Sequence, residues 1–143
     1  KSNYNRKILL TKRVENIIGK SLKNKKISFL GVTFKPNTDD MREASSIPMM
    51  NFLSKKKCKI RYFDPSGEKK ELSKIKNVKF YKNISSACFK SDLIIIHTEW
   101  NVFKLLNFKN LVKKKNFSIY DLRNIYSPIK MKQMKIRYFG VGR

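Results

Sequence analysis

Charged side chains gather in one short stretch of the sequence, where cations stand beside acids. Lys35 and Arg42 are the cations, and three acids share their segment: Asp39, Asp40 and Glu43. A lysine presents a point charge with three donors, whereas an arginine presents a planar fork that fits a phosphate or a carboxylate. The acids can hold such an arginine in place. The stretch therefore indicates either a preorganised anion site or a solvated loop whose ion pairs stabilise by under about 1 kcal/mol each.

Four side chains outside this stretch could also do chemistry. Arg123 is a further candidate for phosphate binding. His97 is the only histidine and ends an apolar run, and we interpret it as a hydrogen-bonded edge residue rather than a general base. Cys58 and Cys88 have no metal-type spacing, and no base is recognisable near either thiol. The sequence therefore indicates anion binding and not a nucleophile with an activating partner.

Apolar patterning predicts the elements that must position these residues. A period close to 3.6 predicts an amphipathic helix over 3–22. Strands are predicted at 26–32, 59–63, 78–81, 93–97, 118–120 and 137–141. After a polar loop over 33–44, a helix capped by Ser45 or Ser46 runs to about residue 54. Further helical segments are predicted at 68–75, 83–90, 101–106, 108–113 and 127–132.

Strands separated by helices imply a parallel sheet that is covered on both faces. The unbroken apolar run at 93–97 supports this, because a strand buried on both faces is apolar throughout. Right-handed crossovers make the fold class α/β: a Rossmann-like, doubly wound, mainly parallel sheet with helices on both faces, preceded by an N-terminal helix. Ligands bind at the carboxyl ends of the strands in such folds. We therefore expect Lys35, Arg42 and Arg123 to meet on one edge of the sheet.

The first turn of this sheet argues against an ordinary dinucleotide site. A phosphate-binding turn of that kind needs G-x-G-x-x-G, whereas Gly31 is followed here by Val-Thr-Phe-Lys. Asp64 ends the second strand, where a ribose-binding acid would lie, but it follows Gly31 by 33 residues instead of about 20. We interpret Asp64 and Pro65 as a turn that ends the strand. This domain is not expected to bind NAD by itself in the usual way.

Length and composition narrow the class of protein. The 143 residues fit one domain, and hydrophobic residues make up 41 %, enough for a core. No apolar run approaches the roughly 20 residues of a membrane span, and no signal peptide is visible. Two cysteines without metal spacing suggest a reducing compartment. We therefore expect a cytoplasmic protein with no membrane partner. The net charge of +24 leaves open a basic nucleic-acid-binding α/β module. However, 27 of the 34 basic residues are lysine, and a lysine-rich coding bias would produce this charge without a nucleic-acid partner.

Five blocks of the sequence resemble the UDP-glucose/GDP-mannose dehydrogenase family. The first is the loop Phe34–Ser46, which has an F-K-x-x-T-D-D-x-R core. The other blocks are Tyr62–Pro65, Thr98–Phe103, Asp121–Asn124 and Tyr138–Arg143. They occur in the order found in the family, and the first loop is similar to one in its C-terminal, nucleotide-sugar-binding domain.

The resemblance implies a three-part enzyme of which these residues form the last part. Such enzymes join an N-terminal NAD domain, a central helical region with a catalytic cysteine, and the C-terminal domain. They oxidise the C6 alcohol of a nucleotide sugar to a carboxylate in two NAD-dependent steps, and they form homo-oligomers. Residues 1–24 would be the tail of the central connecting helix, and 25–143 the UDP-sugar-binding domain. Because the NAD turn and the cysteine motif are missing from these residues, the isolated chain is expected to be inactive.

The resemblance also implies the site residues, position by position. Phe34, Lys35 and Arg123 resemble the family's UDP-sugar contacts, and Arg42 resembles the arginine that reaches across the domain cleft to the NAD pyrophosphate. No residue matches a catalytic or metal-binding position. Leu122 departs from the family pattern, which usually has a small residue before this arginine, and it would narrow the approach to Arg123. The motifs favour the UDP-glucose branch, with the GDP-mannose and UDP-N-acetylhexosamine branches as alternatives.

Overall fold

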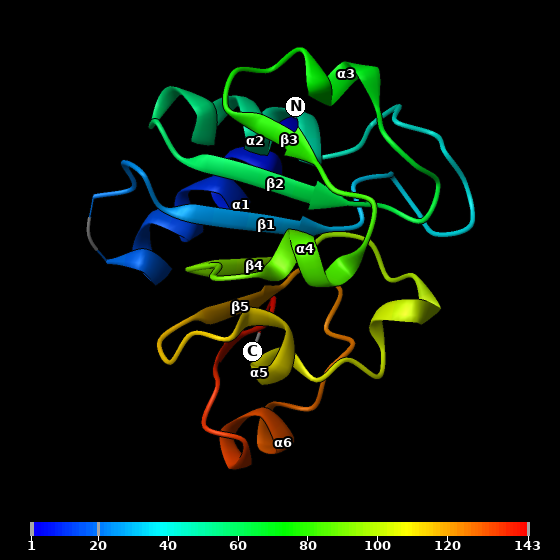
Figure 1. Cartoon of the computed structure of the whole chain (residues 1–143). Helices are drawn as coiled ribbons and strands as arrows, with labels where there is room; N and C mark the ends of the chain where they lie inside the picture. Colours follow the sequence, from blue (N-terminus) through cyan, green and yellow to red (C-terminus); the bar gives the residue numbers. More distant parts are fainter. Residues whose placement is uncertain (1, 20, 143) are drawn as a thin grey trace.

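The computed structural model describes residues 2–19 and 21–142, and within them six strands form one sheet (Figure 1). The strands are β1 (Lys26–Leu30), β2 (Lys59–Phe63), β3 (Val78–Phe80), β4 (Leu93–Ile96), β5 (Ser118–Asp121) and β6 (Arg137–Phe139). Their order is β3-β2-β1-β4-β5-β6, and every neighbouring pair is parallel. Since this is the strand order of doubly wound α/β folds, the predicted fold class is confirmed.

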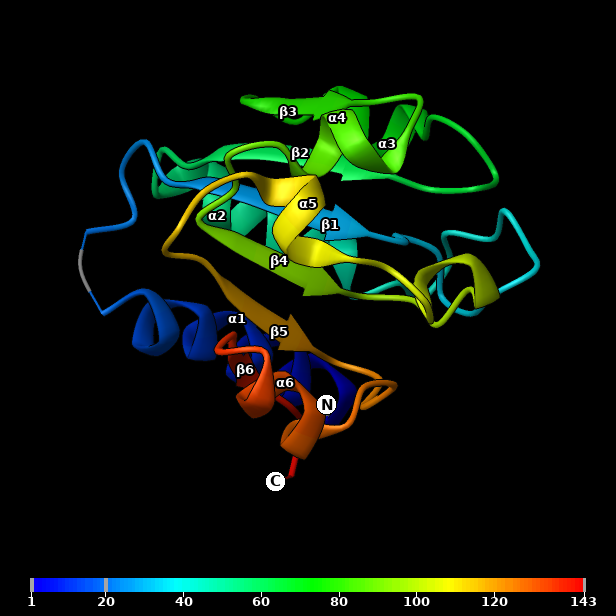
Figure 2. The same ribbon diagram turned by 60° about the horizontal axis from the view of Figure 1, so that its bottom comes forward.

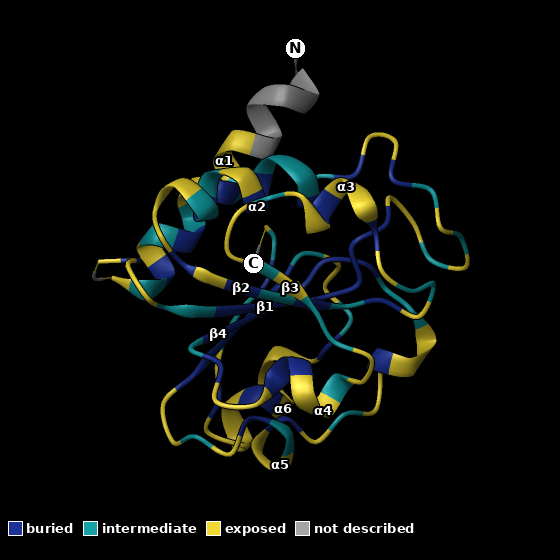
Figure 3. Cartoon of the chain, turned by 45° about the horizontal axis from the view of Figure 1, so that its top comes forward, coloured by how far each residue is buried: buried dark blue, intermediate teal, exposed yellow. Residues whose placement is uncertain are grey.

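Helices cover both faces of the sheet (Figures 2 and 3). They are α1 (Ser2–Ile18), α2 (Ser46–Lys55), α3 (Lys70–Ser73), α4 (Ile84–Cys88), the 3₁₀ helix η1 (Asn101–Phe103), α5 (Phe108–Val112) and α6 (Pro128–Gln133). The first three helices contribute to one hydrophobic cluster through Val14, Met49 and Leu72. The last three α-helices contribute to a second cluster through Cys88, Val112 and Met131. Among the described helices, none combines the length and the apolar character needed to cross a membrane.

The central strand β4 separates these two clusters. It lies between β1 and β5, and each of its four residues is fully buried. Leu93 and Ile95 point into the first cluster, whereas Ile94 and Ile96 point into the second. Successive side chains of a strand point to opposite faces, so an unbroken apolar run is needed where both faces are covered. The predicted burial of this strand is confirmed.

The helix predicted over 3–22 and the strand predicted over 26–32 both end early, each at a glycine with positive φ. The helix predicted over 3–22 ends at Ile18. Gly19 has φ +71° and its N–H donates to the Glu15 carbonyl at 2.9 Å, which is typical of a glycine that ends a helix. The strand predicted over 26–32 ends at Leu30, because Gly31 has φ +79° and turns the chain away from the sheet.

The predicted capping of α2 by a serine side chain is wrong. Ser45 directly precedes the helix, but its hydroxyl is hydrogen-bonded to Nε2 of His97 at 2.8 Å rather than to the α2 backbone. Ser46 donates its hydroxyl proton to the Val32 carbonyl at 2.6 Å. Both serines therefore tie the start of α2 to the ends of β1 and β4. Tertiary partners at this sheet edge outcompete the local cap.

Replacing Gly31 by alanine is expected to lower the free energy of unfolding by about 3 kcal/mol, because strain and overpacking act together. An added Cβ would lie 2.6 Å from Cβ of Thr98 and 3.0 Å from its backbone N and O. Gly67 is a matched control, since it also has positive φ (+98°) but nothing lies within 4 Å of its added Cβ. Its alanine variant should lose only about 1 kcal/mol. Urea unfolding measures both, and equal losses would show that the contact with Thr98 is unimportant.

Candidate functional site

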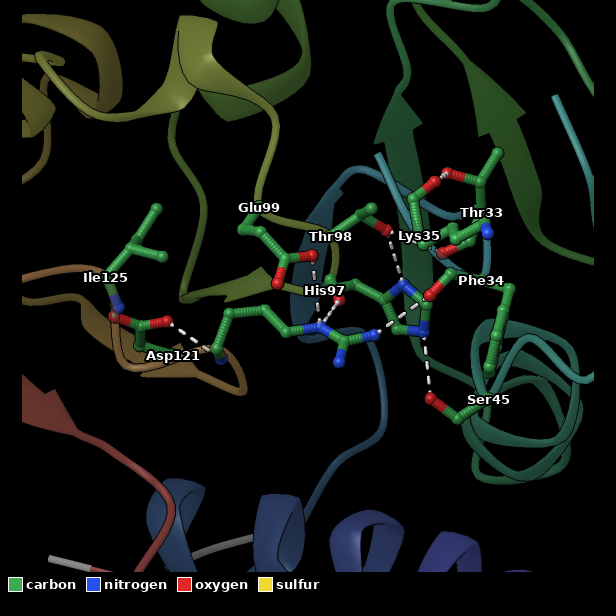
Figure 4. A network of polar contacts seen from close by, with 10 residues as sticks. Thr33, Phe34, Lys35, Ser45, His97, Thr98, Glu99, Asp121 and Ile125 are labelled. Atoms are coloured by element: carbon green, nitrogen blue, oxygen red, sulfur yellow. Dashed lines mark hydrogen bonds and ion pairs between the residues drawn. The ribbon is translucent and has the colours of Figure 1, made fainter. Parts of the chain in front are cut away.

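The candidate site lies at the edge of the sheet where β1, β4 and β5 end (Figure 1). The segments that follow these strands are the loop 31–45, the segment 97–100 and the turn 122–125. All three strands are parallel neighbours, so their carboxyl ends meet at one edge. Figure 4 shows the polar contacts that join these segments.

Arg123 connects the three segments. Its Nε donates to the His97 carbonyl at 2.8 Å, and its Nη2 donates to the Phe34 carbonyl at 3.2 Å. Glu99 lies close by, with Oε1 3.8 Å from Nε, and the Arg123 side chain remains one-third exposed. Among the described residues, no acceptor meets Nη1. The guanidinium is therefore fixed on one side and free to bind an anion with its outer nitrogen.

Asp121, the last residue of β5, holds the turn that carries Arg123. Its Oδ1 accepts the Arg123 N–H at 3.1 Å, and its Oδ2 accepts the N–H groups of Ile125 and Tyr126 at 2.9 and 3.1 Å. The Tyr138 hydroxyl donates to the same Oδ2 at 2.6 Å. The carboxylate is fully buried, and each of its oxygens accepts at least one hydrogen bond. It thereby fixes the backbone from which Arg123 projects.

His97 belongs to a buried chain of hydrogen bonds. The Thr98 hydroxyl donates to the Thr33 carbonyl at 2.8 Å and lies 2.9 Å from Nδ1 of His97, so Nδ1 must be the donor between those two side chains. Nε2 then accepts the Ser45 hydroxyl at 2.8 Å. Burial, with a smaller contribution from the Arg123 charge, lowers the pKa of His97 to about 3. The imidazole is neutral and fully hydrogen-bonded, as expected for a structural edge residue rather than a general base.

The buried His97 predicts a loss of stability in mild acid. The unfolded chain binds a proton at this side chain below about pH 6.5, whereas the folded chain does so only near pH 3. The contribution of neutral His97 to the free energy of unfolding should therefore be complete above pH 6.5. Below this pH, the free energy of unfolding should fall by about 1.4 kcal/mol per pH unit as the pH drops toward 4. No second histidine titrates there, because His97 is the only one. Urea unfolding of the wild type and of His97→Gln at pH 7 and pH 4.5 measures this, and an equal fall in both chains would contradict it.

Phe34 and Lys35 lie in an exposed part of the first loop, beside Arg123. Phe34 is 47 % exposed, and its backbone N–H donates to the Asp40 carbonyl at 3.1 Å. The Thr33 hydroxyl donates to the Lys35 carbonyl at 2.9 Å. These two hydrogen bonds fix the loop backbone, while the side chains of Phe34 and Lys35 are exposed to solvent.

Arg42 is hydrogen-bonded to Asp40, one of the three acids that lie near it in the sequence. Its Nε and Nη2 each donate to Asp40, to Oδ1 and Oδ2 respectively, at 3.1 Å. Hydrogen bonds from Arg42 hold the pKa of Asp40 below its usual value. The Arg42 side chain is 89 % exposed. The structure therefore joins Arg123 to the Phe34 backbone, but it leaves Arg42 in solvent on the outer part of the loop.

Asp64 acts as the turn residue that its context predicted. Its Oδ2 accepts the Val32 N–H at 2.7 Å, and its Oδ1 accepts the N–H of Ser66 at 2.9 Å and its hydroxyl at 2.5 Å. The carboxylate is buried, so it ties the end of β1 to the turn after β2 and does not face a ligand. The two thiols also lack a reactive environment, since burial raises the pKa of Cys58 to about 11 and that of Cys88 to about 12.

Several contacts that shape the site were not predicted from the sequence. The Asn124 side chain makes two 2.8 Å hydrogen bonds with the Val141 backbone and so ties the Arg123 turn to the C-terminal segment. Leu122 packs against the first hydrophobic cluster, on the interior side of the turn. The only signal for Asn124 was its adjacency to Arg123. Nothing in the sequence indicated the hydrogen-bond partners of Thr33 and Ser45, because these partners lie more than fifty residues away.

Comparison with known proteins relates the chain to one enzyme family. The UDP-binding domain of the UDP-glucose/GDP-mannose dehydrogenase family matches residues 28–128. The chain is 36 % identical over 146 residues to the UDP-glucose 6-dehydrogenase of Rickettsia felis and 34 % identical over 142 residues to that of Rhizobium meliloti. Each alignment covers 99 % of this chain and 32 % of the relative, so the chain spans about a third of the length of these relatives.

Solved structures show the same fold. An NDP-N-acetyl-D-galactosaminuronic acid dehydrogenase from Methanosarcina mazei Go1 superposes with a TM-score of 0.78 and 23 % identity, covering 96 % of this chain and 29 % of that one. A UDP-glucose dehydrogenase from Pyrobaculum islandicum gives a TM-score of 0.74 and 22 % identity, with 94 % and 29 % covered. From the family match and the sequence relatives, the chain belongs to the UDP-glucose/GDP-mannose dehydrogenase family and carries its UDP-binding domain.

Proposed function

We propose that this chain is the nucleotide-sugar-binding part of an NAD-dependent UDP-glucose 6-dehydrogenase, which converts UDP-glucose to UDP-glucuronate in two oxidations. The observation that carries the proposal is the guanidinium of Arg123, which is fixed to the Phe34 carbonyl and keeps an outer nitrogen free. Relatives with this name at 34–36 % identity support UDP-glucose as the sugar. UDP-N-acetylhexosamine and GDP-mannose are the alternative substrates.

In this proposal the chain binds and orients the substrate. Nη1 of Arg123 and the ammonium of Lys35 bind the diphosphate, because both cations project from the same edge of the sheet. The exposed ring of Phe34 packs against the sugar or the base. Asp121 and the His97 network keep the two loops from moving as the anion binds, so that little binding free energy is lost in ordering them. The C6 carbon is thereby presented to the rest of the enzyme.

NAD, when bound, accepts the hydride, but the first turn of this chain does not fit its pyrophosphate. The space beside Gly31 that a dinucleotide turn leaves open is filled here by Thr98, 2.6 Å from the position of a Cβ. Asp64 is buried in its own hydrogen bonds. We therefore assign NAD mainly to the part of the enzyme outside these residues. The exposed Arg42 is the one proposed contact from this chain, across the cleft between domains.

The remaining proposals concern the whole enzyme. Residues 1–24 would be the tail of the central connecting helix, and 25–143 the UDP-sugar-binding domain. The complete protein would be a cytoplasmic homo-oligomer without nucleic-acid or membrane partners. Both cysteines are free and buried, which is consistent with a reducing compartment.

Steady-state kinetics of the complete enzyme test this function with two loop variants. Lys35→Ala should raise KM for UDP-glucose about 10-fold with KM for NAD unchanged, because a cation at the diphosphate is lost. Arg42→Ala should raise KM for NAD and leave that for UDP-glucose unchanged. Lys130→Ala, at an exposed position of α6, is the control for loss of one positive charge. Turnover of UDP-N-acetylglucosamine or GDP-mannose in preference to UDP-glucose would reassign the substrate. Binding to nucleic acid with a steep salt dependence would instead favour a nucleic-acid module.

A further inference from the structure

A cationic cavity lies on the face of β2 and β3, at the amino ends of the strands. Its volume is about 420 Å³, and the side chains that line it include Lys26, Lys59, Arg61, Lys79 and Tyr81. No acidic residue lines it. The proposed nucleotide-sugar site is at the opposite edge of the same sheet. The five residues of β2 separate the two edges by about 15 Å.

The strand register places the cations of this cavity directly against one another. Lys26 of β1 is paired with Lys59 of β2, and Arg61 of β2 is paired with Lys79 of β3. Side chains two residues apart share one face of a sheet, so the four cations form a compact group on a single face. Like charges on directly opposed strand positions are unfavourable. Binding of an anion would relieve this repulsion.

Buried hydroxyl groups hold Arg61 in a fixed orientation. Its Nη2 donates to Oγ of Ser91 at 2.7 Å, and Ser91 is 2.6 Å from Oγ of Ser28. Ser28 donates its own proton to the Ala87 carbonyl at 2.5 Å, so the Ser91 hydroxyl donates to Ser28 and accepts from Arg61. Ser28 and Ser91 are fully buried. The guanidinium is thus preorganised by neutral groups.

Arg61 also lacks a carboxylate partner. Its Nε is buried and has no hydrogen-bond partner among the described residues, and burial lowers the pKa of this guanidinium. Asp92 interacts with Arg61 electrostatically, but its carboxylate is already hydrogen-bonded to the Lys26 N–H and to the Lys114 ammonium. On the cavity side, Tyr81 lies between two cations, with its ring centre 6.0 Å from the Arg61 guanidinium and 5.1 Å from the Lys79 ammonium. A half-buried cation without an anion is unfavourable, and this one lines an open cavity.

We propose that this cavity is a second anion site, which binds a diphosphate-bearing small molecule between Arg61 and the three lysines. The planar guanidinium would take two phosphate oxygens. The lysines would neutralise the remaining charge of a multiply charged anion. The site does not depend on the assignment of the opposite edge, because it shares no residue with it.

Calorimetric titration with inorganic pyrophosphate, at physiological salt, tests the site in the complete protein. Arg61→Gln and Lys79→Gln should each weaken binding at least 10-fold. Lys79 is exposed, so its variant keeps the test valid even if Arg61→Gln fails to fold. Arg137→Gln is the matched control, since Arg137 lies at the same end of the sheet and also hydrogen-bonds a buried serine hydroxyl, that of Ser118 at 3.0 Å.

The outcomes of this titration distinguish a specific anion site from nonspecific attraction of anions to the positively charged chain. Binding that is lost in both cavity variants and kept in Arg137→Gln supports the proposal. Absence of binding to the wild type, an equal loss in all three variants, or unchanged binding in both cavity variants would each overturn it. None of these results bears on the KM values for UDP-glucose, so this proposal and the proposed function can fail independently.

Discussion

Replacing Arg123 by alanine is expected to lower kcat/KM of the complete enzyme for UDP-glucose by about 100-fold. The variant loses the hydrogen bonds from Nε to the His97 carbonyl and from Nη2 to the Phe34 carbonyl. If the proposed function is right, it also loses a charge-assisted contact to the diphosphate. A factor of 100 corresponds to about 2.7 kcal/mol, within the range for hydrogen bonds to charged groups. Most of the loss should appear in KM, because in the proposed function Arg123 binds the diphosphate and does not touch the reacting carbon.

Arg123→Lys separates charge from geometry in this prediction. A lysine keeps the positive charge but lacks the planar fork that reaches both carbonyl oxygens, so it should recover only part of the activity. Thermal unfolding of all variants measures whether the fold is intact. A kcat/KM for Arg123→Ala within 3-fold of the wild type would remove Arg123 from the substrate site.

Replacing Asp121 by alanine is expected to lower the free energy of unfolding by about 3 kcal/mol. The buried carboxylate accepts from three backbone N–H groups and from the Tyr138 hydroxyl, and its removal leaves these donors unsatisfied inside the protein. The turn that carries Arg123 should become mobile as a result. Urea unfolding measures the stability, and binding of UDP-glucose should weaken in parallel.

Two further variants serve as comparisons for the stability loss of Asp121→Ala. Asp121→Asn keeps an acceptor oxygen but turns an amide group toward donors, so it should be intermediate in stability. Asp39→Ala removes an exposed acid from the first loop and should change stability by less than about 0.5 kcal/mol. If Asp121→Ala were as stable as Asp39→Ala, the hydrogen bonds to this carboxylate would contribute nothing to folding.

The sequence by itself determined the elements and the edge of the sheet at which the candidate site lies. The apolar run of β4 predicted a strand covered on both faces, because burial on each side excludes polar residues at every position. Alternation of strands with helices then predicted a parallel sheet, and in a parallel sheet all carboxyl ends lie at one edge. The positions of Lys35 and Arg123 near this edge followed from chain order alone, whereas Arg42 lies in solvent on the outer part of the first loop. The turn role of Asp64 was also readable, since a following proline prevents the strand from continuing.

Only the tertiary structure decided how the side chains at this edge are paired. Ser45 had the sequence of a helix cap, yet it is bonded to His97, which is distant in sequence and adjacent in space. Of three acids beside Arg42, Asp40 alone binds it, because side-chain reach depends on the loop conformation. In the sequence, Asp121 is simply a polar residue that follows a predicted strand. In the structure, its carboxylate accepts three backbone N–H groups and so fixes the turn that carries Arg123. Secondary structure follows from local periodicity, but hydrogen bonds between loops depend on separations of a few tenths of an ångström that only the packed sheet sets.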